Sequence, residues 1–244
     1  MIVPGTSAAV CQAETCCARR VPPAEEAPRL IARENEEDSM ARNRGPVVRR
    51  SRRLNMALDP KSERLLDKRP YPPGQTGKSR RPRKMSNFGT QLQEKQRARF
   101  MYDVLERQFR RYYKRATHMK GVVGDNLMSL LEQRLDNVVF RCGFAMSRRM
   151  ARQIVNHGHV QVNGRKVDIP SYHCEPGDII EIRDKSRSHG GIQQAVDQPP
   201  LSMTPNWLEV DSQTLRAKVI GTPSKDDIEQ LQINAQLIVE LYSR

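Results

Sequence analysis

The middle third of the chain carries apolar residues at helical spacing. One set follows the pattern i, i+3, i+4, i+8 and i+11: Met101, Val104, Leu105, Phe109 and Tyr112. This period places the set on one side of a helix. We therefore expect one helix across this stretch, with arginines and lysines on its other faces.

Two further helices are predicted between residues 125 and 158. The first has Asp125 as its N-cap and runs to Gly143. Its inward face is formed by Leu127, Leu131, Leu135, Val138 and Val139. The second begins at Ser147, stops at Gly158, and buries Ala151, Ile154 and Val155. A short polar residue at the start and a glycine at the end are typical helix boundaries.

The apolar period then changes to alternation. The dipeptide Asn163-Gly164 separates two alternating stretches, 160–162 and 167–169. A type I′ turn needs positive φ at both central positions, so this dipeptide predicts a β-hairpin. A second turn, Pro176-Gly177-Asp178, leads into an expected strand at 179–182.

Weaker patterns complete the expected elements. A short helix is predicted at 60–66, with Asp59 as N-cap and Pro60 at its first position. Toward the C-terminus we expect a helix at 186–196, a loop at 197–206, and strands near 207–210 and 217–220. A final helix is expected to carry Ile233, Leu237, Ile238 and Leu241.

The first 84 residues show little core-forming pattern. Residues 1–39 are expected to be a disordered tail. The composition switches from acidic to basic at Met40, which leaves open a translation start at Met1 or at Met40. Residues 40–84 are rich in arginine and proline. We expect this segment to be extended and to become ordered against RNA.

Charge is concentrated in one part of the chain. Residues 40–120 hold 24 of the 42 Lys and Arg but 6 of the 28 Asp and Glu. Such a density predicts a polyanionic partner, and counterion release from nucleic acid is the usual source of the binding energy. A membrane surface is the alternative. No lipidation motif or long basic amphipathic helix accompanies the charge, so nucleic acid is favoured.

Several protein classes are disfavoured by composition. No apolar run approaches the about 18 residues of a transmembrane helix. The N-terminus lacks the pattern of a secretory signal. The five cysteines are odd in number and unevenly spread, which argues against a disulfide framework. We therefore expect a soluble cytoplasmic protein.

Three arginines gather at the start of the helix after Ser147. Arg148, Arg149 and Arg152 lie where free backbone N–H groups and the helix dipole favour an anion. This arrangement predicts a phosphate-binding surface, and a solvated basic face is the alternative. If Arg148 and Arg152 bind phosphates, replacing each of them by alanine is expected to reduce the salt slope of RNA binding by about one.

These motifs together resemble a known module. The segments 132–137, 144–152 and 157–164, followed by 169–172 and 176–178, closely resemble the S-four RNA-binding domain. Five further segments, 69–74, 91–96, 105–109, 207–211 and 237–243, resemble the bacterial-type S-four family of small-subunit ribosomal proteins. The resemblance covers residues 40–244.

The resemblance implies an α+β fold. A mainly helical domain would carry an inserted S-four module of two helices and a β-hairpin, preceded by an extended basic segment. The implied divisions are a basic rRNA-binding segment at 40–84, a helical part at 85–131 and the S-four module at 132–196. The segment 197–244 would pack on the helical domain, and the path of 197–232 stays open.

The resemblance also implies a function. The chain would be a structural constituent of the small ribosomal subunit, a primary binder of 16S-type rRNA that nucleates assembly of the subunit body and contributes to translational accuracy. Neighbouring ribosomal proteins, S-five and S-twelve in this family, would be partners, as would mRNA at its entry path. No cofactor or small-molecule substrate is implied.

Candidate rRNA contacts follow from charge and from the motifs. In the N-terminal segment they are Arg42, Arg44, Arg49, Arg50, Arg52, Arg53, Arg69, Tyr71, Lys78, Arg80, Arg81, Arg83 and Lys84. In the expected helices they are Arg107, Arg110, Arg111, Lys114 and Arg115. In the module they are Arg134, Arg141, Ser147, Arg148, Arg149, Arg152, His157, Asn163 and Gly164. Tyr71 is the candidate for stacking on a base, whereas Phe100, Phe109 and Tyr112 are expected in the core.

Alternative functions fit the sequence less well. S-four modules also occur in RNA-modifying enzymes, but residues 40–244 leave no room for a catalytic domain and no nucleophile constellation. A stand-alone RNA chaperone is the third possibility. The zinc site of some relatives is not expected, because Val48 and Ser51 stand where ligands would be. A site from Cys142, Cys174, His157, His159 and His173 is also disfavoured.

Overall fold

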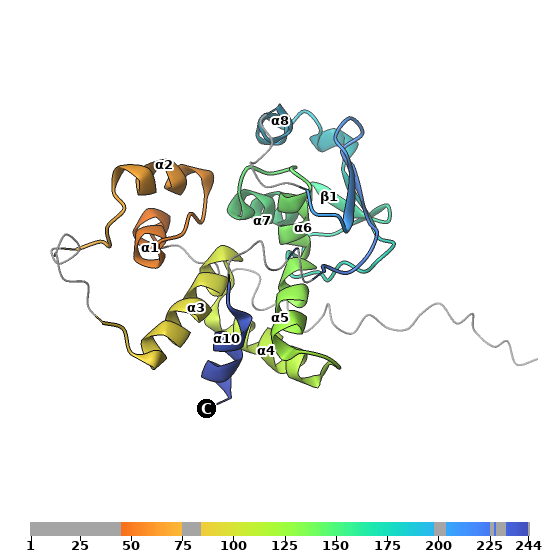
Figure 1. Ribbon diagram of the computed structural model, residues 1–244. Helices are drawn as coiled ribbons and strands as arrows, with labels where there is room; N and C mark the ends of the chain where they lie inside the picture. Colours follow the sequence, from red (N-terminus) through yellow and green to blue (C-terminus); the bar gives the residue numbers. More distant parts are fainter. Residues whose placement is uncertain (1–44, 75–83, 198–203, 225–226, 228–232, 244) are drawn as a thin grey trace, which may run out of the picture.

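The computed structural model describes residues 45–74, 84–197, 204–224, 227 and 233–243 (Figure 1). A pair of short helices at the N-terminal side lies beside a bundle of longer helices. A sheet flanked by helices lies at the upper right of this view. The segments expected to be a tail at 1–39 and a loop at 197–206 fall largely outside these residues.

The first two helices are α1 (Val47–Leu54) and α2 (Pro60–Lys68). The predicted helix at 60–66 is confirmed as α2, with Asp59 as its N-cap. Ser62 Oγ accepts a hydrogen bond of 3.0 Å from the Asp59 backbone N–H, as in a capping box. The expectation of an extended segment at 40–84 is therefore wrong for the residues in these helices.

The single helix predicted from the 101–112 spacing is two helices, α3 (Asn87–Met101) and α4 (Glu106–His118). Between them Asp103 adopts a left-handed conformation with φ of 50°. Apolar residues before, within and after the break, such as Ala98, Val104 and Phe109, are fully buried. Periodicity missed the break because the turn residues pack into the same core as the helical ones.

The helix predicted from Asp125 to Gly143 is also two helices, α5 (Val123–Glu132) and α6 (Leu135–Arg141). The N-cap of α5 is Val122, and Asp125 lies in the first turn instead. The break comes from tertiary hydrogen bonds. Leu135 N–H donates to Tyr172 O at 2.9 Å, and Gln133 O accepts from Cys174 N–H at 2.9 Å.

Helix α7 (Arg148–Asn156) confirms the predicted boundaries. Ser147 Oγ accepts a hydrogen bond from Met150 N–H at 3.3 Å. Gly158, just after the helix, has φ of 71°, a conformation that favours glycine. Sequence signals were sufficient here because the cap and the stop are both local.

The sheet is antiparallel, with the order β2-β1-β3-β5-β4. Its strands are β1 (Val160–Val162), β2 (Arg165–Lys166), β3 (Ile179–Ile182), β4 (Leu208–Asp211) and β5 (Arg216–Val219). The predicted hairpin is confirmed: Asn163 and Gly164 have φ of 50° and 75°. The helix expected at 186–196 is a short 3-10 turn, η3 (Asp184–Ser186), followed by α8 (Gly190–Asp197).

The C-terminal segment is divided between the two halves of the molecule. Strands β4 and β5 pair with each other, and β5 pairs with β3, so they extend the sheet of the module. Helix α10 (Ala235–Tyr242) instead packs on α3 and α5. The expectation that 197–244 packs as a whole on the helical domain is therefore wrong for β4 and β5. It is correct for α10.

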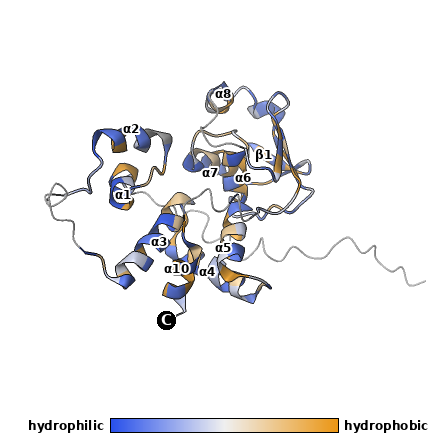
Figure 2. Cartoon of the chain, in the orientation of Figure 1, coloured by the Kyte–Doolittle hydropathy of each residue, from blue (hydrophilic) through white to orange (hydrophobic). Residues whose placement is uncertain are grey.

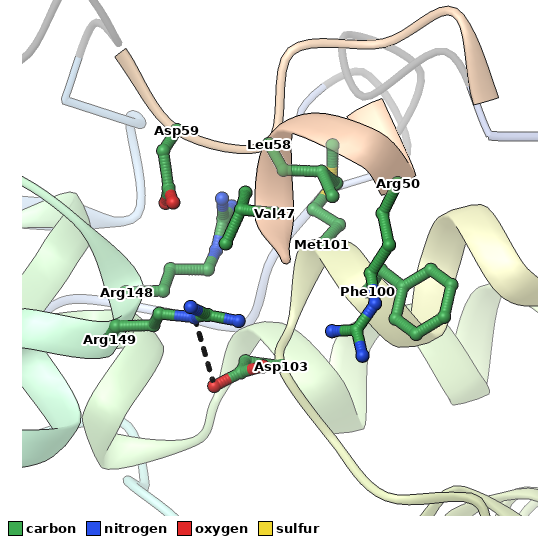
Figure 3. Close-up of a pocket in the computed structure, with 9 residues that line it drawn as sticks. All are labelled: Val47, Arg50, Leu58, Asp59, Phe100, Met101, Asp103, Arg148 and Arg149. Atoms are coloured by element: carbon green, nitrogen blue, oxygen red, sulfur yellow. Dashed lines mark ion pairs between the residues drawn. The ribbon is translucent and has the colours of Figure 1, made fainter. Parts of the chain in front are cut away.

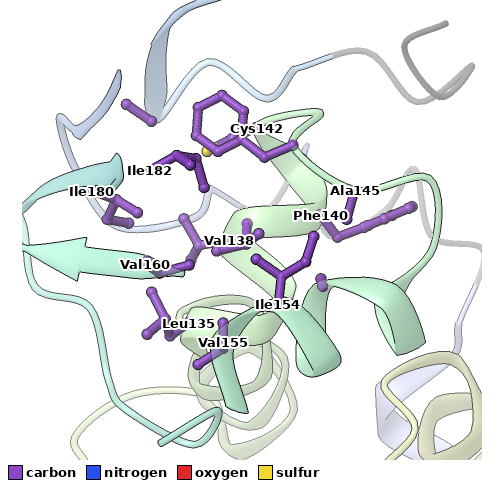
Figure 4. Close-up of a cluster of buried hydrophobic side chains, with 14 of the residues drawn as sticks. Leu135, Val138, Phe140, Cys142, Ala145, Ile154, Val155, Val160, Ile180 and Ile182 are labelled. Carbon is purple, nitrogen blue, oxygen red and sulfur yellow. The ribbon is translucent and has the colours of Figure 1, made fainter. Parts of the chain in front are cut away.

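Two separate groups of buried apolar residues form the core. One lies between α6, α7 and the inner face of the sheet, and includes Val138, Val155, Val160 and Ile180 (Figure 4). The other lies among α3, α4, α5 and α10, where Phe109 is fully buried. Apolar and polar residues alternate along helices such as α1 and α2 (Figure 2). No described helix is long and apolar enough to cross a membrane.

Candidate RNA-binding interface

Helix α4 presents a row of cations to solvent. Four exposed side chains lie on successive turns: Arg107, Arg110, Arg111 and Lys114. The opposite side of the helix buries Phe109 and Ala116 in the core. Core packing thus fixes the direction of the cationic face, so the helix can present several positive charges to a polyanion without rearrangement.

Helix α1 carries a second group of cations. Arg49 and Arg53 are exposed, whereas Arg50 lies over the Phe100 ring at 4.6 Å. Arg52 contacts the Tyr71 ring at 4.8 Å and donates from Nε to Tyr71 O at 3.1 Å. The proposed stacking residue Tyr71 thus has a guanidinium over its ring. Cation–π contacts of this kind orient the arginine.

The remaining N-terminal candidates divide into two sets. Arg69 and Lys84 are exposed in the described chain. The others lie outside the described residues: Arg42, Arg44, Lys78, Arg80, Arg81 and Arg83.

Arg134 is buried in the interior. Its side chain is 1% exposed and forms a two-point contact with Asp136, at 3.1 Å from Nε and 2.7 Å from NH2. NH1 donates to Tyr112 Oη at 2.6 Å. Burial lowers the pKa of Arg134, but the Asp136 charge and the hydrogen bonds to Asp136 and Tyr112 together outweigh that effect and raise the pKa. This cation is already neutralised inside the protein.

Arg141 also points inward, to Glu132. Its Nε and NH2 donate to the two carboxylate oxygens at 3.1 and 3.0 Å. Glu132 accepts further hydrogen bonds from Tyr102 Oη at 2.6 Å and Asn137 Nδ2 at 2.7 Å. Burial would raise the pKa of Glu132, but Arg141 and the other donors hold it below its usual value. Glu132 is therefore a buried charged acceptor that links α3, α5 and α6.

The three arginines of α7 contact the turn between α3 and α4. Arg148 lies 5.4 Å from the Tyr102 ring and donates to Asn137 Oδ1 at 2.9 Å. Arg149 forms an ion pair of 3.7 Å with the Asp103 carboxylate, seen in Figure 3. Arg152 is 7% exposed and donates to the Asp103 carbonyl at 3.0 Å. These side chains surround one turn of the neighbouring helical bundle.

The other module candidates occupy defined structural positions. Asn163 Oδ1 accepts from Ile179 N–H at 2.9 Å, and its Nδ2 donates to Asp178 Oδ1 at 2.7 Å. Ser147 caps α7, whereas His157 and Gly164 are exposed. Asn163 therefore holds the hairpin against β3 in addition to forming its turn.

No described group of three or more His, Cys, Asp and Glu side chains is arranged to hold a metal ion. Cys142 and Cys174 are buried, and burial raises the pKa of both thiols. Such thiols are poor sources of the thiolate that a metal needs.

Two family models match consecutive parts of the chain. The ribosomal protein S4/S9 N-terminal domain matches residues 42–132, and the S4 domain matches residues 133–180. The chain is 50% identical over 205 residues to small ribosomal subunit protein uS4 of Chlorobium limicola, covering 84% of this chain and all of the relative. The corresponding proteins of Chlorobaculum tepidum and Pelodictyon phaeoclathratiforme are 50% and 48% identical over the same share.

The chain belongs to the uS4 family. This family consists of structural, RNA-binding proteins of the small ribosomal subunit rather than enzymes. The sequence resemblance and the expected α+β fold with its S4 module are confirmed.

Sequence reasoning overlooked some basic residues of this uS4 chain. The S4 module exposes cations on β2 and around η3: Arg165, Lys166, Lys185 and Arg187. The near-neutral total charge of residues 121–244 concealed them. Counting charge by local segment, at the turn after Asn163-Gly164 and at 183–187, would have found both groups.

Proposed function

We propose that this chain is a primary rRNA-binding protein of the small ribosomal subunit and that it contacts RNA phosphates through exposed cations on α1, α4 and the S4 module. The observation that carries this proposal is the row of four exposed cations on α4, held outward by a buried apolar face. Family membership supplies the identity of the RNA.

The more specific parts of the proposed function are inferred from membership of the uS4 family. As a primary binder, the chain would dock to the 5′ region of 16S-type rRNA before most other proteins and nucleate assembly of the subunit body. It would contact the neighbouring proteins S-five and S-twelve, contribute to translational accuracy, and lie beside mRNA at its entry path. The ribosome would place it in the cytoplasm.

Recognition would depend on the shape of the RNA more than on its sequence. Base edges are inaccessible to side chains in the deep, narrow major groove of an A-form helix, so proteins contact phosphates and riboses instead. Rigid helices that carry cations suit this task because the positions of the charges are fixed before binding. The candidate contacts that are exposed in the described chain are Arg49, Arg53, Arg69, Lys84, Arg107, Arg110, Arg111, Lys114, His157, Asn163 and Gly164.

Filter binding of the full chain tests this function. The protein is titrated with the 5′ domain of small-subunit rRNA and with length-matched unrelated RNA over a series of salt concentrations. We expect a strong preference for the rRNA that persists at physiological salt. Equal affinity for both RNAs with a steep salt slope would contradict the proposal, because it would show only the binding of a polycation.

Co-sedimentation separates the ribosomal role from that of an RNA chaperone. We expect the protein to sediment with mature small subunits after washing at high salt. A protein found only with free RNA would support the chaperone function instead.

A further inference from the structure

Arg148, Arg149 and Arg152 of the S4 module share one contact surface on the helical bundle. All three lie in the first two turns of α7, and all three contact residues 102–103 in the turn between α3 and α4. Figure 3 shows the ion pair between Arg149 and Asp103. Arg148 contacts the Tyr102 ring, while Arg149 and Arg152 bind the Asp103 carboxylate and carbonyl. We call this set of interactions the α7–turn contact.

We propose that Arg148, Arg149 and Arg152 are positioning residues for rRNA recognition, which fix the S4 module relative to the helical bundle through the α7–turn contact rather than by binding phosphates. This inference rests on the function proposed above. It changes the role that the sequence pattern indicated for these arginines, and it implies that two RNA-binding surfaces are held in one orientation before RNA arrives.

Burial supports a positioning role. Arg152 has its side chain enclosed, and its NH1 is bonded to a carbonyl oxygen of the other half of the molecule. Arg148 lies between two aromatic rings, 5.4 Å from Tyr102 and 4.5 Å from Phe140. A cation held in this way would have to leave its partners to reach a phosphate, and the buried partners left behind would lose their hydrogen bonds.

The conformation of the turn gives independent support. Asp103 is not glycine, yet it has φ of 50° and is 7% exposed. A strained backbone of this kind persists where the surroundings determine it. Both the carbonyl and the carboxylate of Asp103 are held by α7, so the turn and the helix each define the position of the other.

The contact continues into the buried polar network around Glu132. Arg148 donates to Asn137, and Asn137 in turn donates to the Glu132 carboxylate, which also binds Tyr102 of the same turn. The turn is therefore held by α7 on one side and by α5 and α6 on the other. Fully bonded polar networks of this kind specify a single arrangement of the elements they join.

The N-terminal helices meet the same point. Arg148 and Arg149 line a pocket with Asp59 and Arg50 of the α1–α2 unit and with Asp103. The charges of Arg148 and Arg149 lower the pKa of Asp59, although burial has the larger opposite effect and raises it. Three RNA-facing parts of the chain thus converge on the α7–turn contact.

The variant Asp103→Asn distinguishes positioning from phosphate binding by the sign of its effect. Asparagine tolerates positive φ and keeps the backbone carbonyl that Arg152 binds, so the fold is retained. The change removes only the negative charge that faces Arg149. If Arg149 were a phosphate ligand, losing this competitor would strengthen rRNA binding and steepen the salt slope.

The proposal predicts the opposite result. We expect Asp103→Asn to weaken binding to the 5′-domain rRNA by about fivefold with the salt slope unchanged, as for an effect on orientation rather than on counterion release. Affinity for unrelated RNA of equal length is expected not to fall, because non-specific binding depends on cations and this variant removes none. Tighter binding with a steeper slope overturns the proposal.

A second variant tests the hydrogen bond. Arg152→Met keeps the apolar stem and removes the charge, and we expect weaker binding to the specific RNA with an unchanged slope. A slope reduced by about one would identify Arg152 as a phosphate contact and overturn the positioning role. Equal loss of affinity for both RNAs would indicate general destabilisation and would also count against it.

Distance measurement reports on orientation without RNA. Nitroxide labels are attached to cysteines introduced by Thr117→Cys on α4 and Asp168→Cys after β2. The full chain is used, with Cys11, Cys16 and Cys17 changed to serine. Cys142 and Cys174 are kept because they are buried. We expect one narrow distance distribution by double electron–electron resonance, broadened by Asp103→Asn. An unchanged distribution overturns the proposal. If the unsubstituted chain shows no preference for rRNA but the broadening occurs, the proposed function is wrong. The role of the α7–turn contact in fixing the orientation of the S4 module is then still supported.

Discussion

At the scale of single residues, the buried carboxylate of Glu132 is the most consequential group. It is 2% exposed and accepts hydrogen bonds from Arg141, Tyr102 and Asn137. Glu132→Ala removes the acceptor of all three donors and is expected to lower the free energy of unfolding by about 3–5 kcal/mol, as when one partner of a buried ion pair is lost. Denaturant unfolding monitored by circular dichroism measures the change.

Glu63→Ala provides the control, because Glu63 is exposed on α2. This substitution is expected to change the free energy by less than about 0.5 kcal/mol. A Glu132→Ala loss no larger than that of the control would show that the buried network contributes nothing net to stability.

The same carboxylate makes stability depend on pH in a defined direction. Although burial opposes it, the charge of Arg141 and the surrounding donors hold the pKa of Glu132 below its ordinary value of 4.5. A group with a lowered pKa stabilises the fold above its unfolded pKa, and this stabilisation is lost as the pH falls through the folded pKa. Asp103 acts in the opposite direction, because burial raises its pKa.

The difference between two proteins isolates Glu132 from these opposing groups. We expect the free energy of unfolding of the unsubstituted chain to exceed that of Glu132→Gln at pH about 6, and this gap to shrink as the pH falls below about 4, where the carboxylate becomes protonated. Denaturant titrations at several pH values measure the gap. A gap that stays constant or widens toward acid would contradict the lowered pKa.

At the scale of elements, α4 offers a direct count of phosphate contacts. Arg110→Gln with Lys114→Gln removes two exposed cations and leaves the buried face of the helix intact. We expect the salt slope of rRNA binding to fall by about two, one for each lost phosphate contact. The matched control is Arg216→Gln with Lys218→Gln on β5, which removes the same charge from the outer face of the sheet.

The control pair should leave the slope unchanged. If both pairs lowered it equally, the RNA would be responding to total charge, and α4 would have no special part in the interface.

The hairpin turn separates a structural role from an RNA contact. Asn163→Ala loses the preference for φ of 50° and two side-chain hydrogen bonds to β3 and its preceding turn. We expect a loss of about 2–3 kcal/mol in the free energy of unfolding, from the left-handed strain and the unpaired groups together. Thermal unfolding combined with RNA binding measures both effects.

Asn163→Gly divides the two contributions, because glycine restores the turn conformation without the hydrogen bonds. It is expected to lose less stability than Asn163→Ala. A reduced salt slope in either variant would assign Asn163 to the RNA interface, in addition to the turn.

Local signals determined how well each element could be predicted. Helix α7 and the hairpin were found because Ser147, Gly158 and Asn163-Gly164 specify their own conformations. The breaks within 101–112 and 125–143 come from hydrogen bonds and packing with segments distant in the chain. Periodicity cannot reveal such breaks.

The candidate site shows the same distinction at longer range. The cationic face of α4 could be predicted, because it follows from helical spacing and charge. The burial of Arg134, Arg141 and Arg152 could not, since each donates hydrogen bonds to a partner on a different element or across a turn. Charge counts identify basic residues but do not distinguish those that face solvent from those that join elements.

At the scale of the whole molecule, two cores are connected through a few polar contacts. The core of the module and the core of the helical bundle share no residue. Helix α10 closes the second core from the far end of the sequence, after the chain has passed through the whole module. Glu94 accepts from Asn234 N–H at 3.3 Å, and Gln91 Nε2 donates to Glu240 Oε2 at 3.0 Å. The bundle is thus completed only when the C-terminal helix α10 meets α3.

This arrangement predicts that the bundle can open without the sheet. Ile238 of α10 is fully buried, and Ile238→Ala is expected to cost about 2–5 kcal/mol. Because the loss falls within one core, hydrogen exchange should accelerate at the amides of α3, α4 and α5, while β1, β3 and β5 keep their protection. Exchange read by mass spectrometry distinguishes these segments, with Ile220→Ala, an exposed position, as the control. Equal acceleration in both halves would contradict this prediction. It would mean that the α7–turn contact and the Glu132 network couple the two cores into one cooperative unit. The contacts that fix the orientation of the S4 module would then also determine the stability of the protein.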